Sequence, residues 1–526
     1  MSRINTNVSS LIAQRVLNFN NGSLNLSLER LSTGLRINRG KDDPAGLIAS
    51  QNLRAEKGAV GQAITNAERA DQVVNIAEGG LTEISDLLSE LQSLITQTAN
   101  AGGISVEEKQ ANQLQIDSIL QTIDRVAAAT SFQGLKLLNG NLDYTTDNIS
   151  TNIATFKVNG AKVNHDNTLD VDVVVTGSAQ VAGFYLSFGD ANLDLTDADS
   201  RFVLEIAGSR GARELSFVSG TSIADIVAAV NSFTEVTGVV ATLSGSSGTT
   251  SGIVLQSAKF GSDEFVTVRV VGAGGINSAV AQAGIYEFQA ANTNLASTAG
   301  ADRTLFNAAS VKITDRGQDV SATINGIPAT TQGTVARINT DFLDVEVDLR
   351  TGTASSTGAE AQRLGALSAF RITGGGADFQ LAGRVDIAGK VSIGIPNFSV
   401  RNVGRSTINT ASGAETFFLS DLSAGRSLSV VDGDLSAAQD VVAQAIKDVT
   451  SLRGRLGAFQ KNTIGATIRS LGVSLENTSA AESIIRDTDF ANETSALTRS
   501  QVLLSSSTQI LTIANSAPQS ALQLLG

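Results

Sequence analysis

The densest group of residues that could carry chemistry lies between residues 31 and 46. The charged side chains in this stretch have both signs and are Arg36, Arg39, Lys41, Asp42 and Asp43. Asp42 and Asp43 are a candidate carboxylate pair for acid–base chemistry. Adjacent side chains point apart, however, unless a loop folds them together, and no pocket that would perturb their pKa values is evident. We therefore interpret the stretch as a contact region without a catalytic role.

Other classes of chemistry have little support in the sequence. The 526 residues include no cysteine, which excludes thiol nucleophiles, disulfides and thiolate metal sites. The single histidine, His165, lies in a predicted loop with no evident orienting partner for a catalytic triad. Neither a His-Glu-x-x-His zinc motif nor a phosphate-binding Gly-x-x-x-x-Gly-Lys-Ser/Thr loop occurs. We expect no enzymatic activity, no cofactor and no metal.

Charge and hydropathy narrow the choice of partners. A net charge of −13 argues against nucleic acid, because phosphate binding needs clustered Lys and Arg. No apolar run approaches the roughly 18 residues of a membrane span, so we expect no membrane insertion. Residues 1–8 have no apolar core and no small-residue cleavage site, which argues against a cleavable secretory signal.

Helical periodicity flanks the charged stretch on both sides. Leu24, Leu28, Leu31 and Leu35 recur at steps of four, three and four residues. Gly34, Gly40, Pro44 and Gly46 then predict a break, since glycine weakens a helix interior and proline lacks the required N–H. From Val60 to Ile95 apolar residues recur every three or four positions, which predicts a rod-like helix of about 50 residues. Ser105 and Glu108 then form a capping box.

The carboxyl-terminal end repeats this pattern. Apolar residues recur at helical spacing from Val442 to Leu475, and Asp487-Thr-Asp489 interrupts the pattern. A final helix then places Leu497, Leu504 and Leu511 seven residues apart, the spacing of one position in successive coiled-coil heptads. Leu525 lies at the tip.

The middle of the chain has a different period. From about residue 150 apolar and polar residues alternate, as in 168–175 and 344–349, with Gly, Ser, Thr and Asp between the runs. This pattern predicts half-buried strands. The chain is thus predicted to be an α+β multidomain protein, in which paired N- and C-terminal helices form a coiled-coil or bundle rod that carries inserted β-rich outer domains.

Several motifs together resemble those of bacterial flagellin. The most specific are Leu31-Ser-Thr-Gly-Leu-Arg-Ile-Asn38 and Lys41-Asp-Asp-Pro-Ala-Gly46. Further markers in family order are Ile4-Asn-Thr-Asn-Val8, Ile123-Asp-Arg-Val126, Thr130-Ser-Phe-Gln-Gly134, Leu456-Gly-Ala-Phe459, Ile484-Ile-Arg-Asp-Thr-Asp-Phe490 and Ala517-Pro-Gln-Ser-Ala-Leu-Gln-Leu-Leu525. The resemblance covers residues 1–140 and 405–526, and residues 214–243 are similar to a repeat of flagellins and filament-cap proteins.

The resemblance implies an arrangement of domains along the chain. The expected parts are an N-terminal inner-core helix (1–35), a spoke-like linker (36–46), the N-terminal part of a helical rod domain with a β-hairpin (47–180), variable surface-exposed β-rich domains (181–404), the C-terminal part of the rod domain (405–484) and a C-terminal inner-core helix (485–526).

The resemblance also implies function and partners. The chain would be exported by the flagellar type III apparatus and would polymerise into the extracellular helical filament used for swimming. Its partners would be copies of itself, an export chaperone bound through the C-terminal helix, and the filament-cap and hook-junction proteins. The residues expected at the assembly interface are Leu31, Leu35, Arg36, Arg39, Lys41, Asp42, Asp43, Leu497, Leu504, Leu511 and Leu525. Replacing Asp42 and Asp43 by Lys should impair filament formation more than monomer folding.

One property of the family is expected to fail here. Flagellins sensed by Toll-like receptor 5 have a Leu-Gln-Arg-Val-Arg-Glu-Leu run on the first rod helix. The matching run is 88–94, where Glu90 and Gln92 replace the two Arg residues. The residues of this region are Ser89, Glu90, Leu91, Gln92, Ser93, Leu94, Gln97 and Gln115. A reversed charge at an interface centre weakens binding strongly, so we predict weak or absent receptor activation.

Three alternatives remain open at this stage. A hook–filament junction protein shares the plan of helices at both ends, although the Gly34-Leu-Arg-Ile-Asn38 form favours flagellin. An enzyme inserted within residues 180–400 is the second alternative, although a chain whose only histidine is His165 offers little for a zinc or triad hydrolase there. A filament subunit with an added binding role in the same outer region is the third alternative.

Overall fold

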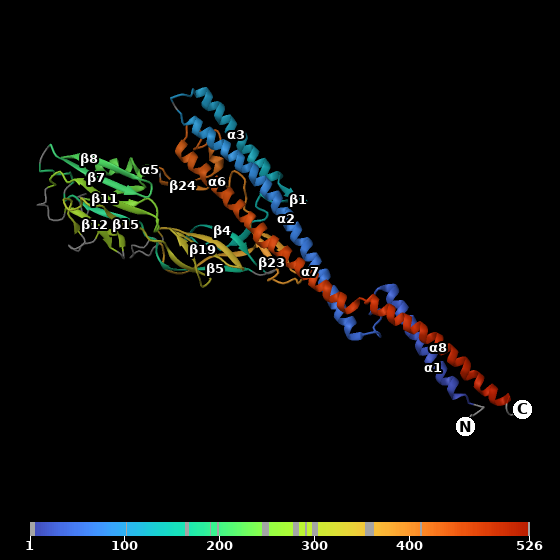
Figure 1. The fold of residues 1–526 in the computed structure, drawn as a ribbon. Helices are drawn as coiled ribbons and strands as arrows, with labels where there is room; N and C mark the ends of the chain where they lie inside the picture. Colours follow the sequence, from blue (N-terminus) through green and yellow to red (C-terminus); the bar gives the residue numbers. More distant parts are fainter. Residues whose placement is uncertain are drawn as a thin grey trace. The chain divides into compact units, whose positions relative to one another are not determined.

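The structure is a computed structural model with helices at both ends of the chain and strands in the middle (Figure 1). It describes residues 6–100, 102–163, 168–189, 191–196, 199–244, 252–276, 283–289, 292–296, 303–352, 362–410 and 413–523. This arrangement confirms the predicted α+β class. The chain divides into two compact units. Unit 1 comprises residues 1–79, 379–391 and 450–526, and unit 2 comprises residues 80–378 and 392–449.

The long helices follow the predicted periodicity closely. They are α1 (Val8–Thr33), α2 (Pro44–Thr98), α3 (Val106–Ala129), α6 (Leu435–Ala458), α7 (Gly465–Arg486) and α8 (Phe490–Gln523). A π-helical segment, Phe459–Ile464, connects α6 to α7. The capping box of α3 is confirmed, because the Ser105 hydroxyl accepts from Glu108 N and the Glu108 carboxylate accepts from Ser105 N. The interruption at 487–489 is confirmed as the gap between α7 and α8.

The predicted break after α1 is shorter than expected. The sequence predicts Pro44 and Gly46 as helix breakers, but α2 begins at Pro44 and includes Gly46 in its first turn. Proline is well placed at the first helical position, because that residue's N–H would have no acceptor within the helix. The segment without helix therefore comprises residues 34–43.

The strands other than β22 and β23 pair antiparallel within the described part of the chain. They are β1 (Ser131–Phe132), β2 (Leu135–Lys136), β3 (Tyr144–Asp147), β4 (Ile153–Ala161), β5 (Leu169–Gly177), β6 (Gly183–Ser187), β7 (Arg201–Gly208), β8 (Ala212–Val218), β9 (Val239–Ser244), β10 (Gly252–Ser257), β11 (Phe265–Gly272), β12 (Gly284–Gln289), β13 (Asn292–Ala296), β14 (Arg303–Thr304), β15 (Ile313–Arg316), β16 (Ser321–Ile324), β17 (Ile327–Pro328), β18 (Thr330–Gln332), β19 (Val335–Asn339), β20 (Leu343–Leu349), β21 (Gly365–Gly375), β22 (Ala377–Gln380), β23 (Lys390–Ile393), β24 (Ser406–Thr410) and β25 (Gly413–Phe417).

Two sheets enclose the first of two β-rich hydrophobic cores in unit 2. Their strand orders are β17-β16-β5-β21-β3 and β18-β19-β20-β4. Alternate residues of these strands, such as Val171, Val173, Val345 and Val347, are fully buried in this core. The sheets of this core begin with β3 at residue 144, close to the position near 150 where the sequence changes period, and β3, β4 and β5 pair with β16, β20 and β21.

Two further sheets and two short helices surround the second core. The sheets are β13-β12-β6-β10-β9, with β14 beside β12, and β15-β11-β7-β8. The helices are α4 (Ile223–Asn231) and α5 (Thr234–Thr237). Phe188, Phe202 and Phe306 form the aromatic centre, with ring centroids 5.2–5.7 Å apart. Ile226 and Val230 of α4 belong to the same core.

Asp319 connects the segments between the two cores of unit 2. Its carboxylate accepts hydrogen bonds from Ser262 N (3.0 Å), Ser262 Oγ (2.6 Å) and Gly333 N (2.6 Å). The backbones of Gly317 and Gly261 also approach closely beside Asp319. A Cβ at residue 317 would lie 2.4 Å from Gly261 O, so only glycine fits at this position. Partial burial opposes ionisation of Asp319, but these donors outweigh it and the pKa of the carboxyl lies below its usual value.

Replacing Asp319 by Asn tests this connection. The pKa of Asp319 is lower in the folded state than its unfolded-state value of 3.8. The ionised carboxylate therefore stabilises the fold above pH 3.8, and this stabilisation is lost as the pH falls through the folded-state pKa. We expect Asp319→Asn to lower the free energy of unfolding by about 1–2 kcal/mol at pH 6 and by much less at pH 3. Denaturation followed by tyrosine fluorescence measures this difference. An equal loss at both pH values would contradict the role of the charge.

Candidate functional site

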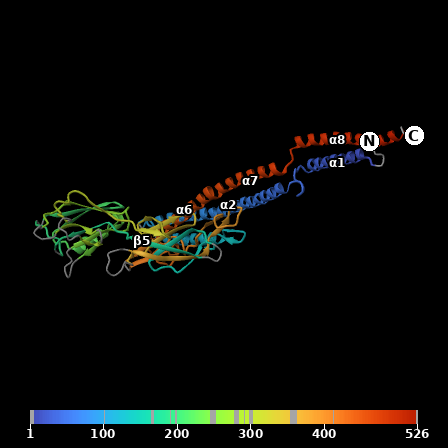
Figure 2. The ribbon, with the colours of Figure 1, turned by 90° about the horizontal axis from the view of Figure 1, so that it is seen from below.

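The seam between α1 and α8 is built from small and polar residues. The two helices run antiparallel and lie side by side in both views (Figures 1 and 2). The buried residues are Ser10, Ala13, Asn20 and Ser27 on α1 and Ser500, Ser507 and Ala514 on the described part of α8, and all of them except Ser10 recur at seven-residue spacing. The predicted heptad leucines, Leu497, Leu504 and Leu511, are only half-buried. Small residues allow the two backbones to approach closely.

Hydrogen bonds fix the register of this seam. Asn20 Nδ2 donates to Ser507 Oγ over 2.6 Å in a buried position. Nearer the ends of the helices, Asn7 Nδ2 donates to Ala514 O over 2.7 Å. A buried polar pair within a helical seam penalises shifted alignments, because any shift would leave its donors and acceptors unpaired. The seam thus has one register.

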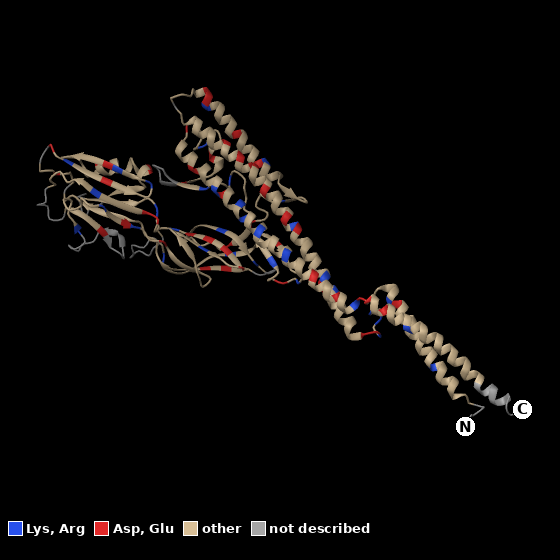
Figure 3. Ribbon diagram, in the orientation of Figure 1, with Lys and Arg blue, Asp and Glu red and all other residues tan. Residues whose placement is uncertain are grey.

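The outward faces of α1 and α8 carry large apolar side chains. They are Val8, Leu11, Ile12, Val16, Phe19 and Leu28 on α1 and Phe490, Val502, Leu503, Ile510 and Ile513 on α8. Phe19 is 74% exposed and Ile513 is 68% exposed. Figure 3 shows few charged residues along α1 and the described part of α8. Leu28, expected on the packed stripe, is 47% exposed because it faces away from the seam.

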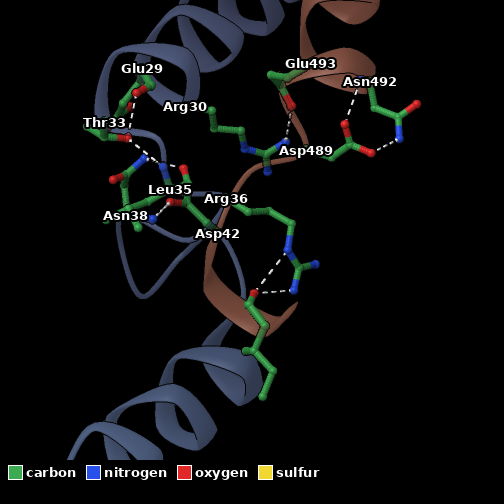
Figure 4. Close-up of polar contacts among 11 residues, drawn as sticks. Glu29, Arg30, Thr33, Leu35, Arg36, Asn38, Asp42, Asp489, Asn492 and Glu493 are labelled. Carbon is green, nitrogen blue, oxygen red and sulfur yellow. Dashed lines mark hydrogen bonds and ion pairs between the residues drawn. The ribbon is translucent and has the colours of Figure 1, made fainter. Parts of the chain in front are cut away.

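Two chain segments meet where α1 and α7 end and are here called the joint, comprising residues 29–43 and 485–493 (Figure 4). Arg36 N donates to Arg486 O over 2.7 Å and Thr488 N donates to Gly34 O over 2.9 Å. These bonds flank an antiparallel bridge between Leu35 and Asp487. Gly34 ends α1 with φ +70°, a conformation that favours glycine. The joint is therefore held by backbone pairing.

The predicted acidic pair serves the local fold of the joint. Asp42 Oδ2 accepts from Arg39 N (2.8 Å) and Asn38 N (3.2 Å), and these bonds, chiefly that from Arg39, lower the pKa of Asp42. Asp43 caps α2, because its Oδ1 accepts from Gly46 N over 2.9 Å. Both carboxylates thus have a role inside the subunit, and their contacts with other subunits stay a prediction.

The basic residues of the joint differ in their partners. The Arg36 guanidinium donates to Ile485 O through Nε (3.2 Å) and Nη2 (2.5 Å). Arg39 pairs with Glu29 over 2.9 Å, and Arg30 pairs with Glu493 over 3.6 Å. Lys41 is exposed, whereas Leu31 and Leu35 are half-buried. The joint therefore collects the predicted residues 31–43 in one place.

The remaining predicted residues lie elsewhere or beyond the description. Leu525 and His165 lie outside the described residues. In the predicted receptor region Leu91 and Leu94 are buried in the core, whereas Ser89, Glu90, Ser93, Gln97 and Gln115 are exposed and Gln92 is half-buried. Ser89, Gln92, Ser93 and Gln97 line a shallow open groove with Glu108 of α3.

Sequence reasoning missed the partners of the predicted residues. Arg486 and Thr488 bond to the 34–36 segment, and Asn20 and Ser507 fix the seam. Small residues at heptad spacing were the available signal for the seam. The pairing of 34–36 with 486–488 has no comparable signal, because it depends on where two helices end in space.

Seam, joint and exposed apolar helices together define a class of protein. No cluster of three His, Asp or Glu residues able to hold a metal ion occurs in the described residues, and the joint's two aspartates bond to backbone N–H groups. None of the described helices is long and apolar enough to cross a membrane. These features define a structural subunit with surface available for association. Family models match residues 4–143 (bacterial flagellin N-terminal helical region), 202–259 (flagellin hook IN motif) and 439–525 (bacterial flagellin C-terminal helical region).

The chain belongs to the flagellin family and is a structural subunit of the bacterial flagellar filament. It is 28% identical over 555 aligned positions to flagellin of Salmonella muenchen and 27% identical to flagellin B of Helicobacter pylori. Each alignment covers 99% of this chain and 99% of the relative. The match to the hook IN motif confirms the predicted resemblance of residues 214–243, which lie in β8, α4, α5 and β9.

Solved structures are also similar to the chain. FliC from Burkholderia pseudomallei is 13% identical, with a TM-score of 0.23, covering 74% of this chain and 99% of that one. The cap protein FliD (D1-D2-D3 domains) from Escherichia coli is 11% identical, with a TM-score of 0.28, covering 66% of this chain and 96% of that one. The family assignment depends on the sequence matches.

Asp43→Ala tests the capping of α2. The variant loses the acceptor for Gly46 N, which should destabilise the start of the helix by about 0.5–2 kcal/mol. Asp43→Asn retains an acceptor oxygen, so we expect it to destabilise the start of the helix by only a few tenths of a kcal/mol. Hydrogen exchange of the amides of residues 46–50 measures the effect. Equal protection in the alanine and asparagine variants would contradict the cap.

Proposed function

We propose that the subunits polymerise through the outward apolar faces of α1 and α8. The observation that supports this proposal is the inverted distribution of side chains, with Asn20 and Ser507 buried in the seam and Phe19 and Ile513 exposed. A helix pair normally buries its large apolar residues. Here those residues can leave water only when a neighbouring copy covers them.

Contacts of this kind favour an open polymer. We propose that a face of α1 or α8 meets a different face of the next copy; such heterologous contacts extend into an open helical polymer when the rotation between copies does not close a ring. Leu497, Leu504 and Leu511 are half-buried between seam and outer face. We propose that these three leucines, together with Leu31 and Leu35, also belong to the surface that a neighbouring copy covers.

The same faces suggest how other partners bind. Before assembly, the exposed apolar residues of α8 need protection, so we infer that an export chaperone binds this C-terminal helix. Heterologous contacts leave free faces at both filament ends, and we infer that hook-junction and cap proteins bind there.

We also propose that the chain has no catalytic role and is secreted through the type III route. The two joint aspartates, the strongest acid–base candidates, serve as hydrogen-bond acceptors for backbone N–H groups. We further propose the domain boundaries that the resemblance implies, with inner-core helices at 1–35 and 485–526, a linker at 36–46, rod segments at 47–180 and 405–484, and surface-exposed domains at 181–404.

Truncation after residue 496 tests the polymerisation proposal. Deleting 497–526 removes most of α8, so the chain should stay soluble but form no filaments. Electron microscopy under polymerising salt, with seeds of the intact protein, measures this outcome. Normal filaments from the truncated chain would contradict it.

A point variant separates the outer face from the seam. Ile513→Ser changes a residue that is 68% exposed, so it should leave the monomer's melting temperature unchanged and raise the critical concentration for polymerisation. Thr512→Ser, at an exposed position beside it, is the matched control and should polymerise as the intact protein does. Equal critical concentrations for both variants would exclude this face from the interface.

We propose that Toll-like receptor 5 is activated weakly or not at all. Glu90 is exposed on α2, where receptor-activating flagellins have Arg, so the surface charge has the opposite sign. Glu90→Arg combined with Gln92→Arg should increase the response of reporter cells more than tenfold. Glu83→Arg, another exposed charge reversal on α2, is the control. A full response to the unaltered chain would refute the prediction.

A further inference from the structure

Charge is distributed unevenly between the two units of the chain. Unit 1 contains 17 Lys and Arg residues and 13 Asp and Glu residues, a formal net charge of +4. Unit 2 contains 21 Lys and Arg residues and 38 Asp and Glu residues, a formal net charge of −17. Every copy of the chain therefore carries a basic part and an acidic part, which attract each other between copies.

The acidic part includes a regular row of carboxylates on α2. Residues 70–108 contain seven Asp and Glu residues and no Lys or Arg. Within this stretch Glu83, Asp86 and Glu90 are exposed, and their spacing of three and four residues places them on one face of the helix. None of the three forms an ion pair among the described residues. They are here called the acidic row.

The basic part includes a matching row on the C-terminal side of the chain. Residues 449–475 contain four Lys and Arg residues and no Asp or Glu. Arg453 is paired with Glu78 over 2.8 Å, whereas Lys461 and Arg469 are exposed and form no ion pair among the described residues. Lys461 and Arg469 are here called the basic row.

The two rows have similar lengths. Lys461 lies in the π-helical segment, whose wider turns place Arg469 about two turns further along and on a similar side of the helix. At about 1.5 Å per residue the basic row spans about 12 Å and the acidic row about 10 Å. Two helices lying side by side can therefore bring both cations next to carboxylates.

We propose that the basic row of one subunit binds the acidic row of a second copy. This contact rests on the filament-forming function and adds a second interface to the apolar faces of α1 and α8. Each subunit uses a different row toward each neighbour, so the contact is heterologous and can repeat along an open polymer. A second copy is the favoured partner because the chain itself carries both complementary rows.

The charges of the β-rich part do not compete strongly for the basic row. Several of its carboxylates are already paired inside the subunit, as in the ion pairs Arg337–Asp344 (3.2 Å) and Arg371–Asp170 (2.5 Å). The acidic row has no such partner in the described residues. Exposed ion pairs are weak one at a time, but a filament repeats the contact at every subunit.

Charge reversal of the basic row tests the proposal in the full-length protein. Lys461→Glu combined with Arg469→Glu should raise the critical concentration for seeded polymerisation about tenfold, because like charges would then face each other. The melting temperature of the monomer should not change, since both side chains are exposed. Raising NaCl from about 0.1 M to about 1 M should shrink the difference from the unaltered chain, because the Debye length falls from about 10 Å to about 3 Å.

A second variant restores the complementarity. Adding Glu83→Lys and Asp86→Lys to the first two substitutions exchanges the signs of the rows and returns the net charge to −13. This quadruple variant should recover most of the lost polymerisation. The matched control is Arg54→Glu with Arg384→Glu, which changes the net charge equally at exposed residues of unit 1 outside the row and should polymerise nearly as the unaltered chain does.

Three results would overturn the proposal. They are an unchanged critical concentration after reversal of the basic row, no recovery in the quadruple variant, and an equal rise in the control variant. Polymerisation of the unaltered chain under the same conditions tests the filament function separately. Filaments from the unaltered chain combined with any of the three results would reject this contact and leave the filament function intact.

Discussion

The seam between α1 and α8 is the constraint on which the behaviour of the subunit depends. Its buried positions are taken by Ala, Ser and Asn, so the large apolar residues of both helices have no place inside it. The hydrogen bond from Asn20 to Ser507 gives the pair a single register but little hydrophobic stabilisation. The large apolar residues of both helices are therefore exposed in the single subunit, on the faces that we propose for contacts with other copies.

The joint connects the α1–α8 pair to the rest of unit 1. Backbone bonds between 34–36 and 486–488 tie the two chain segments together where α1 and α7 end. Asp42 and Asp43 shape the loop that leads into α2, and Gly34 supplies the left-handed turn that ends α1. The charged motif that first suggests chemistry thus sets the geometry of a helix connection.

The β-rich part of unit 2 is stabilised by the burial of apolar residues in hydrophobic cores. Its cores bury Phe, Val, Ile and Leu from antiparallel sheets, and the Asp319 connection adds charge-assisted hydrogen bonds between the segments that separate them. One chain thus combines β-rich domains packed around hydrophobic cores with terminal helices that expose large apolar residues.

The sequence by itself determined the helical ends, the β-rich middle, the interruption at 487–489 and the family, because periodicity and local motifs are properties of neighbouring residues. It did not determine that Pro44 would start α2, that β3, β4 and β5 would pair with β16, β20 and β21, or that Leu28 would be exposed. Only the tertiary structure decided which face of α1 meets α8 and which segment pairs with Leu35. Those choices depend on residues more than 400 positions apart, and no local pattern encodes the distance between them.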